Sequence, residues 1–479
     1  MSLRKTAVSG MMWTFGQQFG TQVIGFFISI ILARLLLPKE FGLLGMISVF
    51  VGIGTSLINS GLTQSLIRTE KADQEDYSTV FFFNLIGSIC IYWMLFFLAP
   101  LIADFFSQPI LIQIIRVYCL TFIISAFSEV QLTRLTKEMN FKLQMTISIP
   151  SLIGSGLLGV FLAYKGFGVW SLVWMSLCQS FLSTVQLWFR AAWTPSFIFN
   201  VPKFKYHFKF GYKLTLSGLL DTIFTNIYLI IIGRFFMAAE VGFYTRANSL
   251  KQLPVTNVSA ALNKVTYPLF ASIQNDNVKL RSIYKQIMQM VVFIIAPILL
   301  IMGVLAEPLF RFLFTEKWLP AVPYFQIMCL AGILYPIHSY NLSILNVKGR
   351  SDLFLKLEIV KKVLVVIMII ATIKFGIIGL IWGQVISSLL AFFINTHYSG
   401  KFLNYNSWKQ TKDILPIILL AFITSAIVWG IDNLLRGYYL NDLIRLIMGG
   451  GAGIGIYTGA AHFLKMSSLL EIKKIILYK

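Results

Sequence analysis

The residues best able to do chemistry in this chain are a few cations inside an otherwise apolar stretch, residues 241–268. Arg246 and Lys264 lie five helical turns apart, so a helix places them on one face together with Asn257, while Lys251 lies further round and near the middle. An ionisable group in a membrane helix costs about 2.5–3.5 kcal/mol, so it usually faces a cavity or a partner. The alternative for Arg246 and Lys264 is that their side chains reach out to the two membrane surfaces.

Two further apolar stretches carry polar groups near their centres. Asp221 lies in the middle of residues 208–233, at about the depth of Lys251. An Asp221–Lys251 pair is expected to be either a static ion pair or a site that takes up a proton or cation. Residues 10–33 carry neutral amides and hydroxyls, which either bind sugar hydroxyls or hydrogen-bond to neighbouring helices; these are Gln17, Gln18, Thr21 and Gln22.

The elements that must position these groups are membrane-spanning helices. Hydrophobic residues make up 57% of the 479 residues and charged residues only 12%, whereas soluble domains average about 45–50% and about 25%. The apolar runs are long and continuous, which excludes a soluble enzyme, a disordered chain and a transmembrane barrel. Fourteen such runs predict an all-α integral membrane protein with about 14 transmembrane helices.

The charged and reactive residues fit this class. The net charge of +21 arises mainly from Lys and Arg in alternate connections, beginning with the N-terminus, which predicts cytoplasmic N- and C-termini. The four cysteines and four histidines show no metal-site spacing, and no Walker A sequence or catalytic constellation occurs. We therefore expect no enzymatic activity, no cofactor, no metal and no nucleic acid.

Two acidic features are expected to be structural. Glu129 should form an interfacial ion pair with Arg134. The acidic cluster at residues 73–76 should be solvated on a short loop.

An internal repeat divides the chain. At an offset of 200 residues, the segment 33–42 lies over the segment 233–242, and both read small-Arg-apolar-apolar-apolar-x-x-Glu-apolar-Gly. This predicts two pseudo-symmetric six-helix lobes that run in the same direction, with a substrate cavity between them. The expected organisation is an N-lobe (1–190), a basic cytoplasmic linker (191–213), a C-lobe (214–400), and two C-terminal helices with a basic cytoplasmic tail (401–479).

The repeat segments also carry a family resemblance. Residues 32–42 with 61–68, and residues 240–247 with 265–270, are similar to Wzx-type flippases of the multidrug/oligosaccharidyl-lipid/polysaccharide (MOP) exporter superfamily. The resemblance implies that the chain flips a polyprenyl-pyrophosphate-linked oligosaccharide from the cytoplasmic to the outer leaflet of the bacterial cytoplasmic (inner) membrane. The flipping would proceed by alternating access and would serve the assembly of a surface polysaccharide. The resemblance implies membrane lipid as a partner. It leaves open whether transport is coupled to H+ or Na+ and whether the chain contacts the polysaccharide polymerase machinery.

The resemblance gives the intramembrane groups expected roles. Cations along one helix would keep the pyrophosphate paired while the headgroup crosses the membrane. The expected substrate-binding residues are Arg246, Lys251, Asn257, Lys264, Gln17, Gln18, Thr21 and Gln22, and the expected ion-coupling residue is Asp221. One alternative is a cation-coupled drug exporter of the same superfamily, with a more acidic cavity. Others are an integral-membrane glycosyltransferase or polymerase, which would need a large outer loop with catalytic carboxylates, and a non-transporting scaffold.

Overall fold

The protein consists of helices throughout the part of the chain that is described. The computed structural model describes residues 3–59 and 61–477, with the side chains of these segments apart from residues 3–8, 11, 59, 260–265 and 475–477. These segments contain no strand, and the prediction of an all-α membrane protein is confirmed. The chain divides into two compact units, Met1–Gly242 and Phe243–Lys479, which are described separately.

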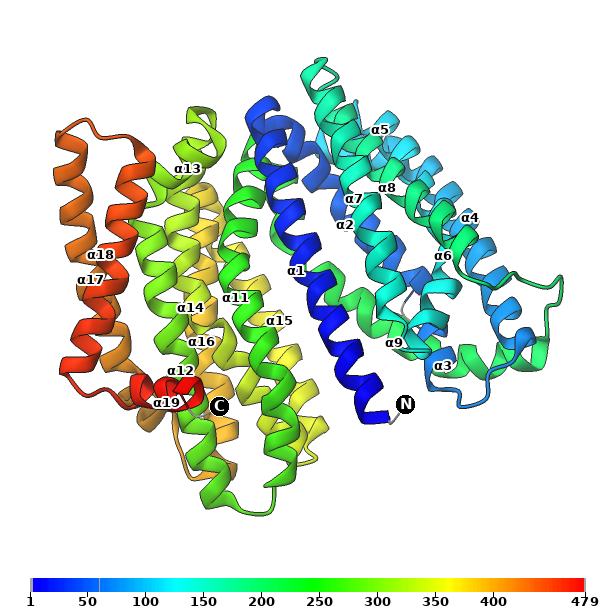
Figure 1. Ribbon diagram of the computed structural model, residues 1–479. Coiled ribbons are helices and arrows are strands. Elements are labelled where there is room, and N and C mark those ends of the chain that lie inside the picture. The colour runs from blue at the N-terminus through cyan, green and yellow to red at the C-terminus, as the bar shows by residue number, and fades with distance from the viewer. Residues whose placement is uncertain (1–2, 60, 478–479) are drawn as a thin grey trace. The chain divides into compact units, whose positions relative to one another are not determined.

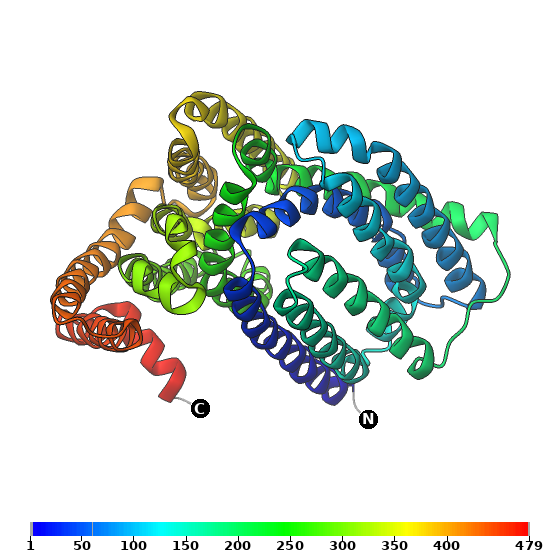
Figure 2. The ribbon, with the colours of Figure 1, turned by 90° about the horizontal axis from the view of Figure 1, so that it is seen from above.

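Unit 1 is a helical bundle in which neighbours along the chain pack against one another. In it α7 packs between α1 and α8, and α6 packs against α4 and α8 (Figures 1 and 2). Its helices are α1 (Leu3–Leu35), α2 (Pro38–Asn59), α3 (Leu62–Arg68), α4 (Gln74–Phe106), α5 (Leu111–Tyr118), α6 (Leu120–Lys137), α7 (Phe141–Tyr164), α8 (Val169–Arg190), α9 (Val201–Thr225), α10 (Ile227–Phe235) and the start of α11 (Ala238–Ser272).

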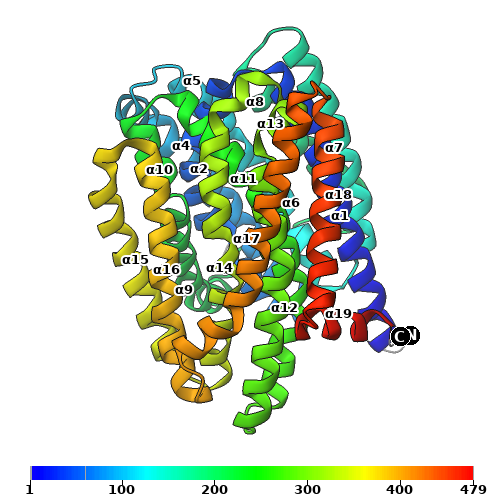
Figure 3. The same ribbon diagram turned by 90° about the vertical axis from the view of Figure 1, so that its left-hand side faces the viewer.

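Unit 2 continues α11 and adds a second bundle. Here α14 packs between α12 and α16, and α17 lies beside α18 (Figure 3). A buried ion pair of 2.8 Å joins Asp432 of α17 to Arg445 of α18. The helices are α12 (Asn277–Val304), α13 (Ala306–Phe314), η1 (Glu316–Ala321), α14 (Val322–Val347), α15 (Ser351–Thr372), η2 (Ile373–Phe375), α16 (Gly376–Leu403), α17 (Ser407–Gly437), α18 (Asp442–Phe463) and α19 (Ser467–Leu477).

The number of candidate membrane spans differs from the predicted fourteen. Among the described residues, eleven helical segments are long and apolar enough to cross a membrane, or twelve if the bent pair α9 and α10 forms one span. The segment 351–403 counts once although it contains α15 and α16, and α11, which is rich in Asn, Ser, Thr and Gln, is not among the eleven. The predicted count of fourteen is therefore not confirmed.

The two copies of the sequence repeat adopt the same local structure and touch each other. Pro38 begins α2 and Ala238 begins α11. A Cβ atom on Gly42 would lie 1.6 Å from the carbonyl oxygen of Ala238, and one on Gly242 would lie 2.0 Å from that of Pro38. Only glycine allows two backbones to approach this closely, so the Gly pattern of the repeat has a packing cause within unit 1.

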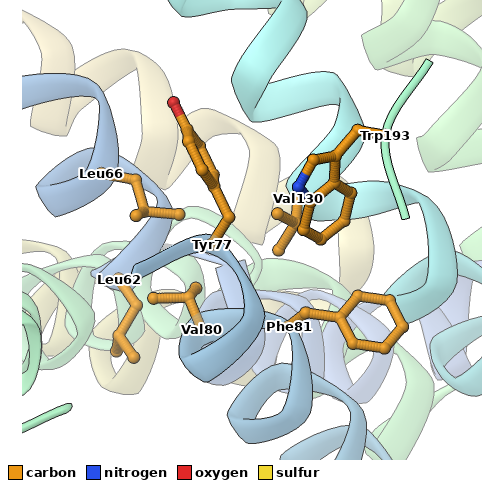
Figure 4. Packing of buried hydrophobic residues seen from close by; sticks show 7 residues of the cluster. All are labelled: Leu62, Leu66, Tyr77, Val80, Phe81, Val130 and Trp193. Atoms are coloured by element: carbon orange, nitrogen blue, oxygen red, sulfur yellow. The ribbon is translucent and has the colours of Figure 1, made fainter. Parts of the chain in front are cut away.

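An apolar cluster, which we call the floor, lies at the end of unit 1 where α4 begins. The ring centroid of Trp193 lies 6.1 Å from that of Tyr77 and 6.1 Å from that of Phe81, both in edge-to-face contacts. Figure 4 shows these rings meeting the aliphatic side chains of α3 and α6, and all seven side chains are at most 9% exposed. The members are Leu62, Leu66, Tyr77, Val80, Phe81, Val130 and Trp193. This floor packs α3 against α4. It therefore also holds in place the polar residues that lie between or beside its members in the sequence.

Candidate functional site

The predicted cations of α11 have different surroundings. Arg246 is 8% exposed, and its guanidinium carbon lies 5.0 Å from the ring centroid of Phe314 and 5.2 Å from that of Trp318. An arginine over aromatic faces gains about 0.5–2 kcal/mol, depending on desolvation. This contact joins α11 to α13 and η1 inside unit 2, and a role of Arg246 in substrate binding stays a prediction.

Lys251 is a cation of α11 whose charge meets no partner among the residues that the structure describes. The carbon stem of Lys251 packs over Gly332 of α14, with Cγ and Cδ 3.5 Å from where a Cβ on that glycine would lie. No carboxylate or hydrogen-bond acceptor from the described residues meets the Nζ atom of this half-buried side chain. In the membrane span that the sequence predicts here, an unpaired ammonium would be costly, so Lys251 marks a position where an anion would be favoured.

The remaining α11 positions are less informative. Asn257 is exposed and donates from Nδ2 to the backbone oxygen of Leu253 at 2.8 Å, so one of its two donor hydrogens is used within its own helix. The side chain of Lys264 lies outside the described residues. The predicted shared face of Arg246, Asn257 and Lys264 is thus described only in part.

The amide face of α1 divides into bonded and available groups. Gln17 donates to Ser148 of α7 at 2.9 Å, and Thr21 donates to the backbone of Gln17 at 2.8 Å. The Gln17 bond joins two helices, as in the interhelical alternative that the sequence left open, whereas the Thr21 bond lies within α1. By contrast, the amides of the exposed Gln18 and the half-buried Gln22 make no hydrogen bond to any residue that the structure describes. Gln18 and Gln22 are therefore the better candidates for binding a polar ligand.

Asp221 lies on α9 in unit 1 and is exposed. Its neighbour Thr222 forms a hydrogen bond of 2.8 Å with Ser56 of α2. Lys251 belongs to unit 2, so the expected Asp221–Lys251 pair, and the ion-coupling role attached to it, stay predictions.

Both acidic expectations from the sequence need correction. Arg134 pairs with Glu138, one helical turn further on, at 2.7 Å. Glu129, in turn, has no ion pair with a described residue. The pair that was predicted from nearness in sequence is therefore wrong, because an i,i+4 partner was available to Arg134.

The acidic cluster at residues 73–76 is not simply solvated. Asp73 and Asp76 form a reciprocal cap at the N-terminus of α4, where carboxylates also meet the positive end of the helix dipole. Asp76 is 7% exposed, and its Oδ1 lies 3.1 Å from Nε2 of His207 on α9. The expectation of a solvated loop is therefore wrong for Asp76.

His207 is the centre of a polar connection that the sequence did not reveal. The ring is fully buried, and its Nδ1 lies 2.8 Å from the hydroxyl oxygen of Ser65 on α3. Since a carboxylate only accepts, Nε2–H donates to Asp76, and in the neutral ring Nδ1 accepts from Ser65. One turn earlier, Lys203 donates to Asp73 and lowers the pKa of that carboxyl to about 2. We call Ser65, Asp73, Asp76, Lys203 and His207 the clasp.

Comparison with known proteins places this architecture in a family. Residues 31–323 match the family described as "Polysaccharide biosynthesis protein". The teichuronic acid biosynthesis protein TuaB of Bacillus subtilis is 24% identical, covering 100% of this chain and 99% of the relative. The lipopolysaccharide biosynthesis protein WzxC of Escherichia coli is 25% identical over 90% of each chain. The succinoglycan biosynthesis transport protein ExoT of Rhizobium meliloti is 25% identical over 70% of this chain and 68% of its own.

Solved structures show the same fold at much lower sequence identity. The lipid II flippase MurJ in an inward closed conformation superposes with a TM-score of 0.72 at 12% identity, covering 95% of this chain and 99% of its own. An inward-facing multidrug resistance transporter of the MATE family, from the MOP superfamily, gives a TM-score of 0.62 at 16% identity over 80% and 96%. The chain is thus a multi-pass membrane protein with a MurJ-like transporter fold, and it belongs to the family of polysaccharide biosynthesis proteins.

Proposed function

We propose that this protein flips an oligosaccharide linked to a polyprenyl pyrophosphate from the cytoplasmic to the outer leaflet of the bacterial cytoplasmic membrane. The names of TuaB, WzxC and ExoT, which refer to teichuronic acid, lipopolysaccharide and succinoglycan, support a role in surface polysaccharide assembly. The fold shared with a lipid II flippase supports a transport mechanism by alternating access. In this proposal both termini lie in the cytoplasm, and the two repeats form lobes around the substrate path.

Lys251 is the observation that carries the proposal. Its ammonium has no partner among the described residues and stands near the middle of α11, the helix that this proposal places across the membrane. A pyrophosphate that leaves water needs compensating positive charge, and charge-assisted hydrogen bonds are the strongest that a side chain can offer it. Lys251 would hold the pyrophosphate during crossing, while Arg246, Asn257 and Lys264 would contribute further contacts along α11.

The oligosaccharide would be recognised by neutral groups. Gln18 and Gln22 of α1 offer both donors and acceptors to sugar hydroxyls. Gln17 and Thr21 would orient this face through the bonds they already make. Asp221 would bind the proton or cation that drives the cycle.

The experiment that tests the function is removal of the gene followed by complementation. We expect the deletion strain to lose its surface polysaccharide and to accumulate the lipid-linked oligosaccharide inside the cell. A chain with Lys251→Met should restore export about 10- to 100-fold less well than wild type, because it loses a hydrogen bond to a charged group, and Lys251→Arg should restore it better. The matched control is Lys374→Met at the exposed turn η2.

Two results would contradict the proposal, and they concern different parts of it. Normal surface polysaccharide in the deletion strain would reject the function itself. Full complementation by Lys251→Met, at equal protein level in the membrane, would reject the role of Lys251 and leave the function standing.

A further inference from the structure

α9 buries few of its residues against the rest of unit 1. Of its 25 residues, Val201–Thr225, only His207 and Gly211 are buried within the protein. Large apolar side chains of the same helix, such as Leu216 and Leu220, remain 59% and 49% exposed. A helix that buries so little of its surface is held weakly, and such elements are the ones that open locally.

The contacts that hold α9 include polar groups, small residues and aromatic rings. The ring centroid of Phe204 on α9 lies 4.9 Å from that of Phe83 on α4, and the guanidinium carbon of Arg68 on α3 lies 4.3 Å from the ring centroid of Phe210. The clasp connects α9 to α3 and α4 through His207 and Lys203. One turn beyond His207, a Cβ atom on Gly211 would lie 2.7 Å from the carbonyl carbon of Gly61, so the two backbones touch. Near the other end of the helix, Thr222 meets Ser56 of α2. The polar and small groups among these contacts can be rehydrated when α9 separates, whereas the aromatic contacts are lost.

The partner surface of the clasp is built mainly by segments outside α9, with Phe204 of α9 packed against the apolar cluster. Asp73 and Asp76 cap α4 whether or not α9 is present. Ser65 lies between Leu62 and Leu66 in sequence, and both leucines belong to the apolar floor of Figure 4. The linker before α9 is bonded separately to α4, where the Ser196 amide donates to the hydroxyl of Ser78 at 3.0 Å. We call Ser65 and Asp76 the socket, and these contacts hold both residues through segments other than α9.

Both ends of α9 provide places where the chain can bend. At its start, Asn200 caps the helix in an extended conformation, with its side chain accepting from the Lys203 amide. At its end, Asn226 interrupts the helical conformation between α9 and α10, and the axes of the two helices differ by 45°. α9 can thus rotate as one rod while its flanking segments stay in place.

We propose that α9 is a releasable gate element, and that His207 is the positioning residue that docks it by inserting into the socket of Ser65 and Asp76. This inference deepens the proposed transport function. In the docked state α9 is held against α3 and α4, and release of the clasp frees this helix, the first of the second repeat, to move during the transport cycle.

The first test measures docking without any transport. In a background without the four native cysteines, Ser65→Cys places a thiol beneath His207, at a side chain with 0% exposure. Labelling of the purified protein by a water-soluble maleimide should be slow. It should become about tenfold faster when His207→Ala is added, because docking loses a buried hydrogen-bonded partner. Lys209→Ala, an exposed change on the same helix, is the matched control and should leave the rate unchanged.

A second reporter separates local release from general unfolding. Ser171→Cys is equally buried but lies in α8, away from the clasp. It should stay unlabelled with His207→Ala. Equal acceleration at residues 65 and 171, or no acceleration at residue 65, would overturn the inference.

The second test locks the gate. With Ser65→Cys, the thiolate, the imidazole of His207 and the carboxylate of Asp76 form a set that Zn²⁺ binds at about 2.0–2.3 Å. Added Zn²⁺ should lower export by this variant about tenfold, a chelator should reverse the effect, and the further change His207→Ala should abolish it. Export that is unaffected by Zn²⁺ in a strain that depends on the protein would overturn the gate role but not the proposed function. Loss of the export phenotype in the gene deletion test is the separate criterion for that function.

Discussion

The crossing of α2 and α11 allows a quantitative test of how the repeat packs. With Gly42→Ala, the new methyl group would lie 1.6 Å from the Ala238 carbonyl oxygen, where ordinary contact begins near 3.4 Å. The two helix starts must separate by nearly 2 Å, and no side-chain rotation can relieve the clash because the obstacle is backbone. Overpacking of this kind costs about 1–3 kcal/mol. We expect a similar penalty for Gly242→Ala, whose methyl group would lie 2.0 Å from the Pro38 carbonyl oxygen.

The assay is thermal unfolding of the purified protein in detergent, with each variant compared with wild type. A destabilisation of 1 kcal/mol should lower the Tm by roughly 2–4 °C for a unit of this size. The double variant Gly42→Ala/Gly242→Ala should lose less than the two single losses together, because one separation of the helices makes room for both methyl groups. Gly87→Ala in α4 is the matched control, since nothing lies within 4 Å of its Cβ position, and it should stabilise by up to about 1 kcal/mol.

Two outcomes would refute this reasoning. Single variants as stable as the Gly87→Ala control would show that the backbones are not in contact at this crossing. Fully additive losses in the double variant would show that the two glycines do not share one contact.

Three further predictions concern ionisable side chains. Arg445→Met should lower the free energy of unfolding by about 3–5 kcal/mol because it leaves Asp432 buried and unpaired, whereas Arg445→Met combined with Asp432→Leu should recover most of the loss; denaturation of each variant checks this. Arg246→Gln should lower stability by about 0.5–2 kcal/mol through loss of its aromatic contacts, and an unchanged Tm with lost export would place the guanidinium on substrate instead. Asp221→Asn should remove the dependence of export on external pH or sodium, and normal export with its dependence intact would reject the coupling role.

Features that depend on composition and local order could be predicted from the sequence. Long apolar runs exclude every soluble class, and each copy of the repeat marks a helix start because a Pro or Ala and a Glu follow the turn, as at Pro38 and Glu40. The glycine that ends each motif could be recognised as a repeat position. That Gly42 and Gly242 contact each other could not, because a sequence offset carries no information about distance in space.

The polar connections were hidden for the same reason. Asp76 and His207 are separated by 131 residues, and nothing in either local sequence indicates the other. Trp318 and Arg246 are likewise brought together only by the packing of α11 against η1. Lys251, by contrast, could be singled out from the sequence alone, because a cation in the middle of a predicted membrane span is improbable wherever its partners are.

The contact between Gly42 and Gly242 has a consequence for the ancestry of the chain. A residue that touches its own repeat counterpart makes the kind of contact found on the dyad of a symmetric homodimer. Two identical half-length proteins would have met there, each supplying the same glycine, before gene duplication and fusion joined them. Any replacement in such an ancestor would have been felt twice, once from each partner, so selection for glycine would have been strongest before the halves diverged.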